Sequence, residues 1–245
     1  MNSTSNKVKK QFVKEFLHFS LSTAAVNASK LLTSIFVADL SGPVNFATWN
    51  ILQPILLYGS IISLGVPNAM NRYVPMLTGA SRKQQADDWI RFAFWFTVSA
   101  CMAASFLLIA ISFFDHFLPF SSNCLLFMSF LFFAYNIYNF FLFVLKSCVQ
   151  FDLMSLQLIL FAVVWPIACV VLTWVWGVNG YIIAQFLVYT TISVWIYCRS
   201  GVILTRPSTF TLFRPATVVG FPIMLAGLLL SLMLTVDRWI ILQWL

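Results

Sequence analysis

The chain has 245 residues, of which 61% are hydrophobic and 9% are charged, whereas soluble domains carry about 25% charged residues. A water-soluble surface is therefore excluded. The net charge of +7 does not indicate a nucleic-acid partner, because the basic residues are spread over short connectors between apolar runs and form no single patch.

Apolar runs of the length that crosses a bilayer as a helix recur along the whole chain. They are continuous and do not alternate, which predicts an all-α polytopic membrane bundle and excludes a β-barrel. We expect seven transmembrane helices, at 16–38, 47–70, 89–114, 124–146, 154–176, 178–198 and 216–241. Pro54, Pro166 and Pro222 fall inside the second, fifth and seventh of them and are expected to bend these helices, for a transport function or for purely structural reasons.

These spans predict four parts of the chain. A basic cytoplasmic tail covers 1–15, and a six-helix transmembrane lobe covers 16–198. A cytoplasmic linker follows at 199–215, and 216–245 is the first helix of a second lobe that is incomplete in this chain.

Basic residues concentrate on one side of the predicted bundle. Seven spans place the connectors alternately on two sides, and one side holds twelve of the 14 lysines and arginines. These are Lys7, Lys9, Lys10, Lys14, Arg72, Arg82, Lys83, Arg91, Lys146, Arg199, Arg206 and Arg214. The connectors of the other side, 39–46, 115–123 and the turn near Gly177, hold none. The positive-inside rule therefore predicts a cytoplasmic N-terminus and places residue 245 on the far side.

The first span carries a stripe of polar side chains. Ser20, Thr23, Asn27, Lys30 and Ser34 follow one another at spacings of three and four, so they share one helical face. An ammonium group within a span costs about 2.5–3.5 kcal/mol on insertion scales. We interpret the stripe as the wall of a wet central cavity in which Asn27 and Lys30 bind substrate. The alternative is that the stripe joins helices and Lys30 pairs with an acid structurally.

The fourth span carries Tyr135, Asn136, Tyr138 and Asn139 near its centre. Amides together with aromatic rings suit the hydroxyls and faces of carbohydrates, so Asn136 and Asn139 are candidate substrate-binding residues. Hydrogen bonding between helices explains the two asparagines equally well.

Charged residues also mark the far side of the bundle. Asp39 ends the first span, and Asp237 and Arg238 lie near the end of the seventh. Arg238 is a candidate for substrate binding, and Asp39 and Asp237 are candidates for ion coupling. A structural ion pair is an equal interpretation for Asp237 and Arg238.

Catalytic and metal sites are not indicated. Asp87 and Asp88 are interpreted as caps of the third span that can also meet Arg91, more readily than as metal ligands. His18 and His116 are isolated, and we find no nucleophile–base arrangement and no cofactor motif. We therefore expect a protein that is not an enzyme and has no cofactor. The cysteines occur singly and are expected to be packing residues without disulfides: Cys101, Cys124, Cys148, Cys169 and Cys198.

Four runs resemble the polysaccharide and O-antigen flippases of the multidrug/oligosaccharidyl-lipid/polysaccharide (MOP) exporter superfamily. They are FVADLSGPVNFATWN, ISLGVPNAMNRYVPMLTG, WGVNGYIIAQFLVYTTI and FRPATVVGFPIMLAGLLLSLMLTVDRWII. The second matches best, with its LG, its small-residue turn and its RY-x-P. This resemblance implies two six-helix bundles that face each other around a cavity open alternately to either side.

The resemblance also implies the function. Such a protein moves a polyprenyl-diphosphate-linked oligosaccharide across the bacterial inner membrane for O-antigen or capsule synthesis. It contacts membrane lipids and acts beside a polysaccharide polymerase and chain-length proteins. Lys30 and Arg238 are the residues expected to meet the diphosphate. Family members carry twelve or more spans, so we interpret the chain as truncated or partial.

Three other functions stay open. One is multidrug or metabolite efflux on the same fold. Another is a membrane scaffold subunit of a glycan-assembly complex, and a third is a membrane glycosyltransferase, although no large loop is present for its chemistry.

Overall fold

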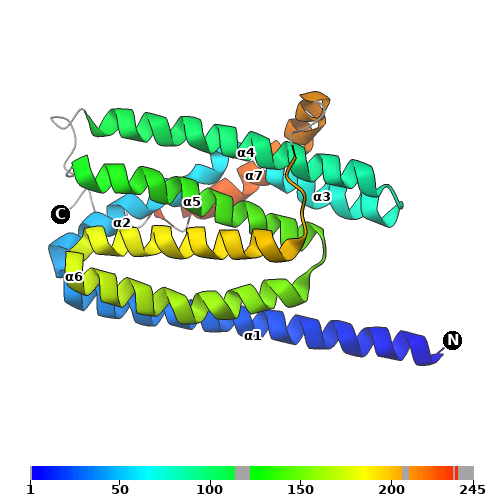
Figure 1. Cartoon of the computed structure of the whole chain (residues 1–245), viewed down its shortest axis with the longest axis horizontal. Coiled ribbons are helices and arrows are strands. Elements are labelled where there is room, and N and C mark those ends of the chain that lie inside the picture. The colour runs from blue at the N-terminus through cyan, green and yellow to red at the C-terminus, as the bar shows by residue number, and fades with distance from the viewer. Residues whose placement is uncertain (1, 114–121, 206–209, 234, 237–245) are drawn as a thin grey trace.

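Helices form all the regular structure in the part of the chain that the structure, a computed structural model, describes: residues 2–113, 122–205, 210–233, 235 and 236. The elements are α1 Asn2–Ser41, α2 Pro43–Tyr58, η1 Gly59–Ser63, α3 Val66–Gly79, α4 Lys83–Ser112, α5 Ser122–Ser147, α6 Phe151–Ser200, η3 Phe210–Leu212 and α7 Phe213–Met233. The long helices lie nearly side by side (Figure 1). The predicted all-α bundle is confirmed.

The helices account for the seven predicted passes. Five are long and apolar enough to cross a membrane, and the bent pair 45–63 and 66–79 adds one more. Helix α6 has 50 residues, about 75 Å at 1.5 Å per residue, which is far more than the roughly 30 Å of a hydrocarbon core. Its backbone leaves the helical conformation at Gly177 (φ 58°, ψ −138°), and the two halves fold back on each other (Figure 1). Helix α6 therefore crosses twice, with its turn where the sequence predicted it.

The second pass is broken, and not at its proline. Pro54 lies inside the continuous helix α2, whereas the 55° bend falls between Ser63 and Val66. Leu64 (φ 49°) and Gly65 (φ 75°) both adopt the left-handed conformation there, which ends a helix because the chain can no longer continue the i to i−4 hydrogen bonds. The bend of this span therefore comes from two left-handed residues rather than from Pro54.

Helix α5 is the centre of the bundle. In its most apolar stretch 61% of the residues are buried inside the protein, against 11% for α4 and 17% for α7. It contacts α4 on one side and α6 on the other, and its fully buried residues include Met128, Leu131, Phe132, Phe140 and Leu145. The phenylalanine-rich sequence of this span thus fills the core, while the neighbouring helices turn apolar faces outward.

Hydroxyl groups within the spans mostly bond to their own helix. Thr33 Oγ1 donates to the Ser29 carbonyl at 2.7 Å, and Ser193 Oγ donates to the Tyr189 carbonyl at 2.7 Å. Such bonds satisfy the hydroxyl without water. Ser29 is an exception, because its Oγ donates across to the Ala162 carbonyl of α6 at 2.8 Å and fixes α1 against the first half of that helix.

The connectors that hold the basic residues meet at one end of the bundle. The turn between α3 and α4, the turn between α5 and α6, and residues 201–205 lie there, together with the N-terminus (Figure 1). We call this the basic end. Helix α1 begins at Asn2, so the residues expected to form a separate tail extend this helix. The opposite end holds the turns at Gly42 and Gly177 (Figure 1).

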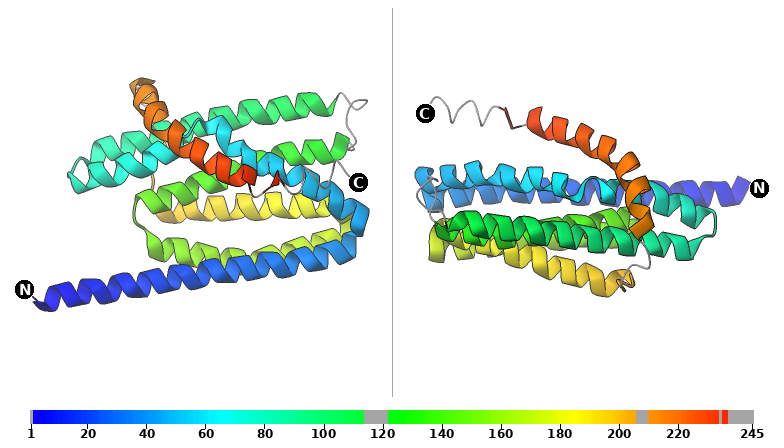
Figure 2. Two further views of the ribbon diagram at one scale, coloured as in Figure 1. Left: turned by 180° about the vertical axis from the view of Figure 1, so that it is seen from behind. Right: turned by 90° about the horizontal axis from the view of Figure 1, so that it is seen from above.

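Helix α7 meets the rest of the bundle through glycine. A Cβ atom on Gly220 would lie 2.0 Å from the Gly65 carbonyl oxygen, and one on Gly65 would lie 2.2 Å from the Gly220 carbonyl oxygen. No side chain fits between these backbones. The backbone of α7 therefore lies in direct contact with the backbone at the break in the second pass. Helix α7 lies on the side of the bundle away from the second half of α6 (Figure 2).

This crossing predicts a difference between two glycines of α7. Gly220→Ala should destabilise the protein by about 1–3 kcal/mol, because overpacking forces the backbones apart. Gly227 has nothing within 4 Å of its added Cβ, so Gly227→Ala should leave stability unchanged or raise it by up to about 1 kcal/mol. Thermal unfolding of the purified variants in one detergent measures both effects, and equal transition temperatures would contradict the backbone contact.

Candidate functional site

A cavity of about 360 Å³ lies between α1, α2, α5 and both halves of α6. Its polar lining consists of Lys30, Ser34, Asn50, Gln53 and Gln185. Its aromatic lining consists of Phe46, Trp49, Tyr135, Trp165, Tyr181 and Tyr189. The lining residues of α2 and of the second half of α6 follow the turns at Gly42 and Gly177, so the cavity lies in the half of the bundle away from the basic end.

Lys30 is the only cation among the lining residues that the structure describes. Its Nζ lies 5.2 Å from the Phe161 ring centroid and 5.9 Å from that of Trp165. Cation–π contacts are worth about 0.5–2 kcal/mol, which offsets part of the roughly 2.5–3.5 kcal/mol that an ammonium costs within a span. No described carboxylate forms an ion pair with Lys30. Water or an anionic ligand must therefore offset the rest of the free-energy cost of placing the ammonium in the span.

The lining contains no acid in the described part of the chain. The ion pair found there, Arg91 Nη1 to Asp88 Oδ1 at 3.6 Å, lies near the basic end. A cavity with a lysine and no carboxylate has a positive field that low-dielectric walls strengthen.

Gln185 supplies an unused donor at the same cavity. Its side chain is 2% exposed, and its Nε2 has no hydrogen-bond partner. A buried amide without a partner costs about 1–3 kcal/mol, so this group is poised to donate to a ligand or a water molecule. Gln157, fully buried behind the cavity, donates from its Nε2 to Tyr138 Oη at 2.6 Å.

Aromatic rings stabilise this arrangement. Tyr138, Phe161, Trp165 and Tyr189 form a continuous cluster, in which Phe161 stacks on Trp165 at 4.8 Å and Tyr138 contacts Tyr189 at 4.9 Å. Stacked and edge-on pairs each add about 0.5–1.5 kcal/mol beyond their buried area. The cluster fixes the two rings that face Lys30, so the position of the ammonium is set by α6.

The structure brings only some of the predicted residues together. Lys30 and Ser34 line the cavity, whereas Asn27 is exposed on α1 and is not among the lining residues. Asn136 is buried, and its Nδ2 donates to the Phe132 carbonyl at 2.9 Å. Asn139 hydrogen-bonds Tyr135, which itself lines the cavity. These two asparagines are thus satisfied inside the protein.

Of the two predicted acidic residues, the structure describes Asp39, which does not line the cavity. Asp39 is exposed in the last turn of α1. Asp237 and Arg238 lie outside the described residues. The structure therefore gives no position for the predicted far-side cluster.

Sequence reasoning missed the amides of α2 and α6. Asn50, Gln53 and Gln185 occur singly in apolar runs. The presence of a polar amide within a span is the only feature of the sequence that indicates a functional role for them. Nothing in the sequence shows that α2 and α6 turn these amides toward the cavity that Lys30 lines.

Two smaller predictions concern acids and cysteines. Helix α4 begins at Lys83, so Asp87 and Asp88 lie in its second turn and do not cap it. The capping interpretation is therefore wrong, whereas the predicted pairing of Asp88 with Arg91 is confirmed.

The five cysteines are free thiols. Burial raises the pKa of the Cys148 thiol, and the nearby Asp87 carboxylate raises it further. Among the described residues, no group of histidine, cysteine or acidic side chains could hold a metal ion.

Comparison with solved structures identifies the fold. An outward-facing multidrug resistance MATE family transporter of the MOP superfamily superposes with a TM-score of 0.75 at 18% identity, covering 91% of this chain and 54% of that one. A MOP superfamily transporter from Pyrococcus furiosus superposes with a TM-score of 0.74, at the same identity and coverage. The chain has the MATE/MOP transporter fold. It spans about half the length of these two proteins. No protein-family model and no curated protein sequence matches the chain.

The cavity predicts a pattern of water accessibility. In a background that lacks the five native cysteines, Ser34→Cys and Asn50→Cys should react with a charged, water-soluble thiol reagent. Ile35→Cys should react roughly tenfold more slowly or not at all, because Ile35 is 58% exposed on the lipid-facing side of α1 and a thiol surrounded by lipid does not ionise to the reactive thiolate. Equal labelling rates at residues 34 and 35 would rule out a hydrated cavity.

Proposed function

We propose that this chain forms the first bundle of a MOP-type transporter that moves a polyprenyl-diphosphate-linked oligosaccharide between the leaflets of the bacterial inner membrane. The polar head enters the cavity at Lys30, and the lipid tail stays in the bilayer. No chemical step on the substrate is required. The N-terminus is cytoplasmic, so the cavity lies in the periplasmic half of the bundle.

The observation that carries this proposal is the charge of the cavity. Among the described residues Lys30 has no carboxylate partner, and Gln185 presents an unpaired donor from a buried side chain. Both groups suit an acceptor-rich anion such as a diphosphate or a sugar acid, and charge-assisted hydrogen bonds to such groups are the strong ones. A cationic drug would find no counter-ion among the described lining residues.

The other lining residues of the cavity have the chemistry that suits a carbohydrate substrate. Asn50 and Gln53 place amides beside the rings of Trp49, Tyr181 and Tyr189, and Trp49 packs edge-on against Tyr181 at 5.0 Å. Amides bind hydroxyl groups, while flat ring faces cover the apolar faces of a pyranose. One cavity thus combines a site for negative charge with a site for carbohydrate.

One of the structural neighbours makes such a difference in substrate plausible for this fold. The Pyrococcus furiosus transporter is described as having a binding pocket of reverse polarity, which suggests a different function for it. Pocket charge is a property of a few side chains and not of the fold. We propose that the cavity of this chain, which has no acid among its described lining residues, selects anionic cargo.

The complete transporter needs a second bundle facing the first. Helix α7 would begin that bundle, and alternating access would come from rocking of the two bundles about the cavity. A polysaccharide polymerase and chain-length proteins are proposed as its partners in the membrane. Asp39 and Asp237 are proposed as coupling residues, and Arg238 as a second contact to the diphosphate.

Replacement of Lys30 tests the proposal. Lys30→Met in the chromosomal gene should reduce surface polysaccharide about ten- to hundredfold at equal protein level, since a hydrogen bond to a charged group contributes about 1.5–3 kcal/mol. Gln185→Leu should reduce it less. The readout is surface polysaccharide per cell, together with accumulation of the lipid-linked precursor on the cytoplasmic side.

Lys146→Met is the matched control, because Lys146 also lies over an aromatic ring, Phe143 at 5.7 Å, but does not line the cavity. It should leave export unchanged. Wild-type polysaccharide levels in Lys30→Met would refute the anionic-cargo proposal. A changed drug-resistance profile with intact polysaccharide would instead assign the cavity to efflux.

A further inference from the structure

The bundle has a second hollow whose chemistry is opposite to that of the cavity. An apolar groove of about 710 Å³ runs between α4, α5 and the second half of α6. One of its walls, the second half of α6, lies on the side of the bundle away from α7 (Figure 2). None of its lining residues is shared with the cavity of Lys30.

The groove is built for a long apolar ligand. On α4 its lining extends from Phe94 to Ile109, about 22 Å at 1.5 Å per residue, which is most of the roughly 30 Å thickness of the hydrocarbon layer. Phe106, Phe130 and Val194 line it and are exposed, so the groove opens toward lipid. A flexible hydrocarbon chain fits this shape better than a compact ligand does.

The serine hydroxyls of the groove are already hydrogen-bonded. Ser105 Oγ donates to the Ser129 carbonyl at 3.1 Å, Ser129 Oγ to the Leu126 carbonyl at 2.7 Å, and Ser193 Oγ to the Tyr189 carbonyl at 2.7 Å. The lining also includes the hydroxyls of Thr190 and Tyr197, but no charged side chain of the described residues. A charged or strongly polar ligand would therefore lose its water and gain few partners.

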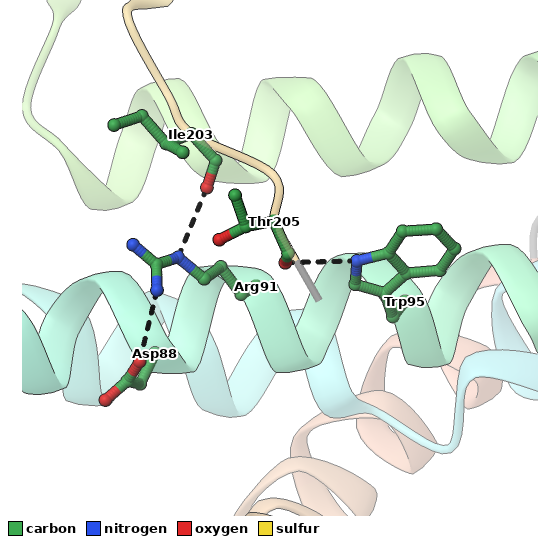
Figure 3. A network of polar contacts seen from close by, with 5 residues as sticks. All are labelled: Asp88, Arg91, Trp95, Ile203 and Thr205. Carbon is green, nitrogen blue, oxygen red and sulfur yellow. Dashed lines mark hydrogen bonds and ion pairs between the residues drawn. The ribbon is translucent and has the colours of Figure 1, made fainter. Parts of the chain in front are cut away.

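The groove ends at the connector that follows α6. Leu204 lines the groove, and the residues on either side of it are held to α4 (Figure 3). Arg91 Nε donates to the Ile203 carbonyl at 3.4 Å, and Trp95 Nε1 donates to the Thr205 carbonyl at 3.2 Å. Indole rings favour the level of the lipid headgroups, which places this end of the groove at the membrane surface.

Positive charge surrounds the same end. Arg91 lies one turn before the lining residue Phe94, and the exposed Arg199 lies two residues after the lining residue Tyr197. Asp88 neutralises part of the charge of Arg91, but Arg199 has no described partner of this kind. Such a surface attracts anionic headgroups at about 1 kcal/mol per basic residue.

We propose that the groove binds one acyl chain of an anionic phospholipid from the surrounding bilayer, with its headgroup at Arg91 and Arg199. The chain packs between α4, α5 and α6, and the headgroup meets the connector to α7. This site does not depend on the transported substrate, because it shares no residue with the cavity.

Two adjacent threonines of α6 provide the test. Thr190 and Thr191 are both exposed, but only Thr190 lines the groove. The purified protein is titrated with phosphatidylglycerol or phosphatidylcholine, and bound lipid is counted by native mass spectrometry. Thr190→Trp should weaken phosphatidylglycerol binding at least about tenfold by excluding methylene groups from the groove, and Thr191→Trp should bind like wild type.

The headgroup is tested separately by Arg199→Gln, which should abolish the preference for phosphatidylglycerol over phosphatidylcholine while lipid still binds. Wild-type binding in Thr190→Trp would overturn the groove as the site. Equal affinity of the wild-type protein for both lipids would overturn the anionic headgroup. Retention of a polyprenyl phosphate from the host membrane in place of phosphatidylglycerol would also refute the proposal.

Discussion

Within a membrane every polar group needs a partner inside the protein, and this constraint explains most of the structure. Within helices the backbone N–H and C=O groups bond to each other. Hydroxyl groups such as those of Thr33 and Ser193 donate hydrogen bonds to backbone carbonyls one turn earlier. Some polar groups of the described residues lack such a partner. Lys30 has aromatic rings but no described acid beside it, and the Nε2 of Gln185 has no described partner. Buried oxygens of Ser41, Thr97, Ser155 and Gln157 are unpaired as well, but Lys30 and Gln185 line one cavity together.

The aromatic cluster of α6 links the core to this cavity. The rings of Phe161 and Trp165 make cation–π contacts with the Lys30 ammonium. The centroids of both rings also lie close to that of Tyr189, at 5.7 and 5.4 Å. Tyr189 in turn contacts Tyr135 and Tyr138 of α5, the helix that is most deeply buried. The single positive charge of the cavity is therefore positioned by the best-packed part of the bundle, which limits how far it moves while a ligand is bound.

The two hollows of the bundle separate the two kinds of chemistry that an amphiphile presents. The cavity has amides, a lysine and ring faces, whereas the groove has mostly apolar side chains and a few hydroxyls. They lie on different faces of α5 and α6, so each can be filled without the other. The chain leaves the bundle at residues 201–205, beside the basic end of the groove, and returns as α7, which crosses at Gly65 and Gly220.

The sequence by itself determined the all-α membrane fold class, the number of passes and the turn at Gly177. Each segment that crosses a hydrocarbon layer must have a minimum length and a low polarity, and both can be seen in the sequence. It also singled out Lys30, since a lone charge in an apolar span is visible without coordinates. It did not show that the second pass breaks at Leu64 and Gly65 rather than at Pro54, or that Asn136 is satisfied by its own helix. Only the tertiary structure decided that Asn50, Gln53 and Gln185 face Lys30 while Asn27 does not. Their convergence depends on how α1, α2 and α6 are rotated about their axes, which is set by the packing of these helices against one another and of α2 and α6 against α5. Such long-range packing leaves no local pattern in the sequence.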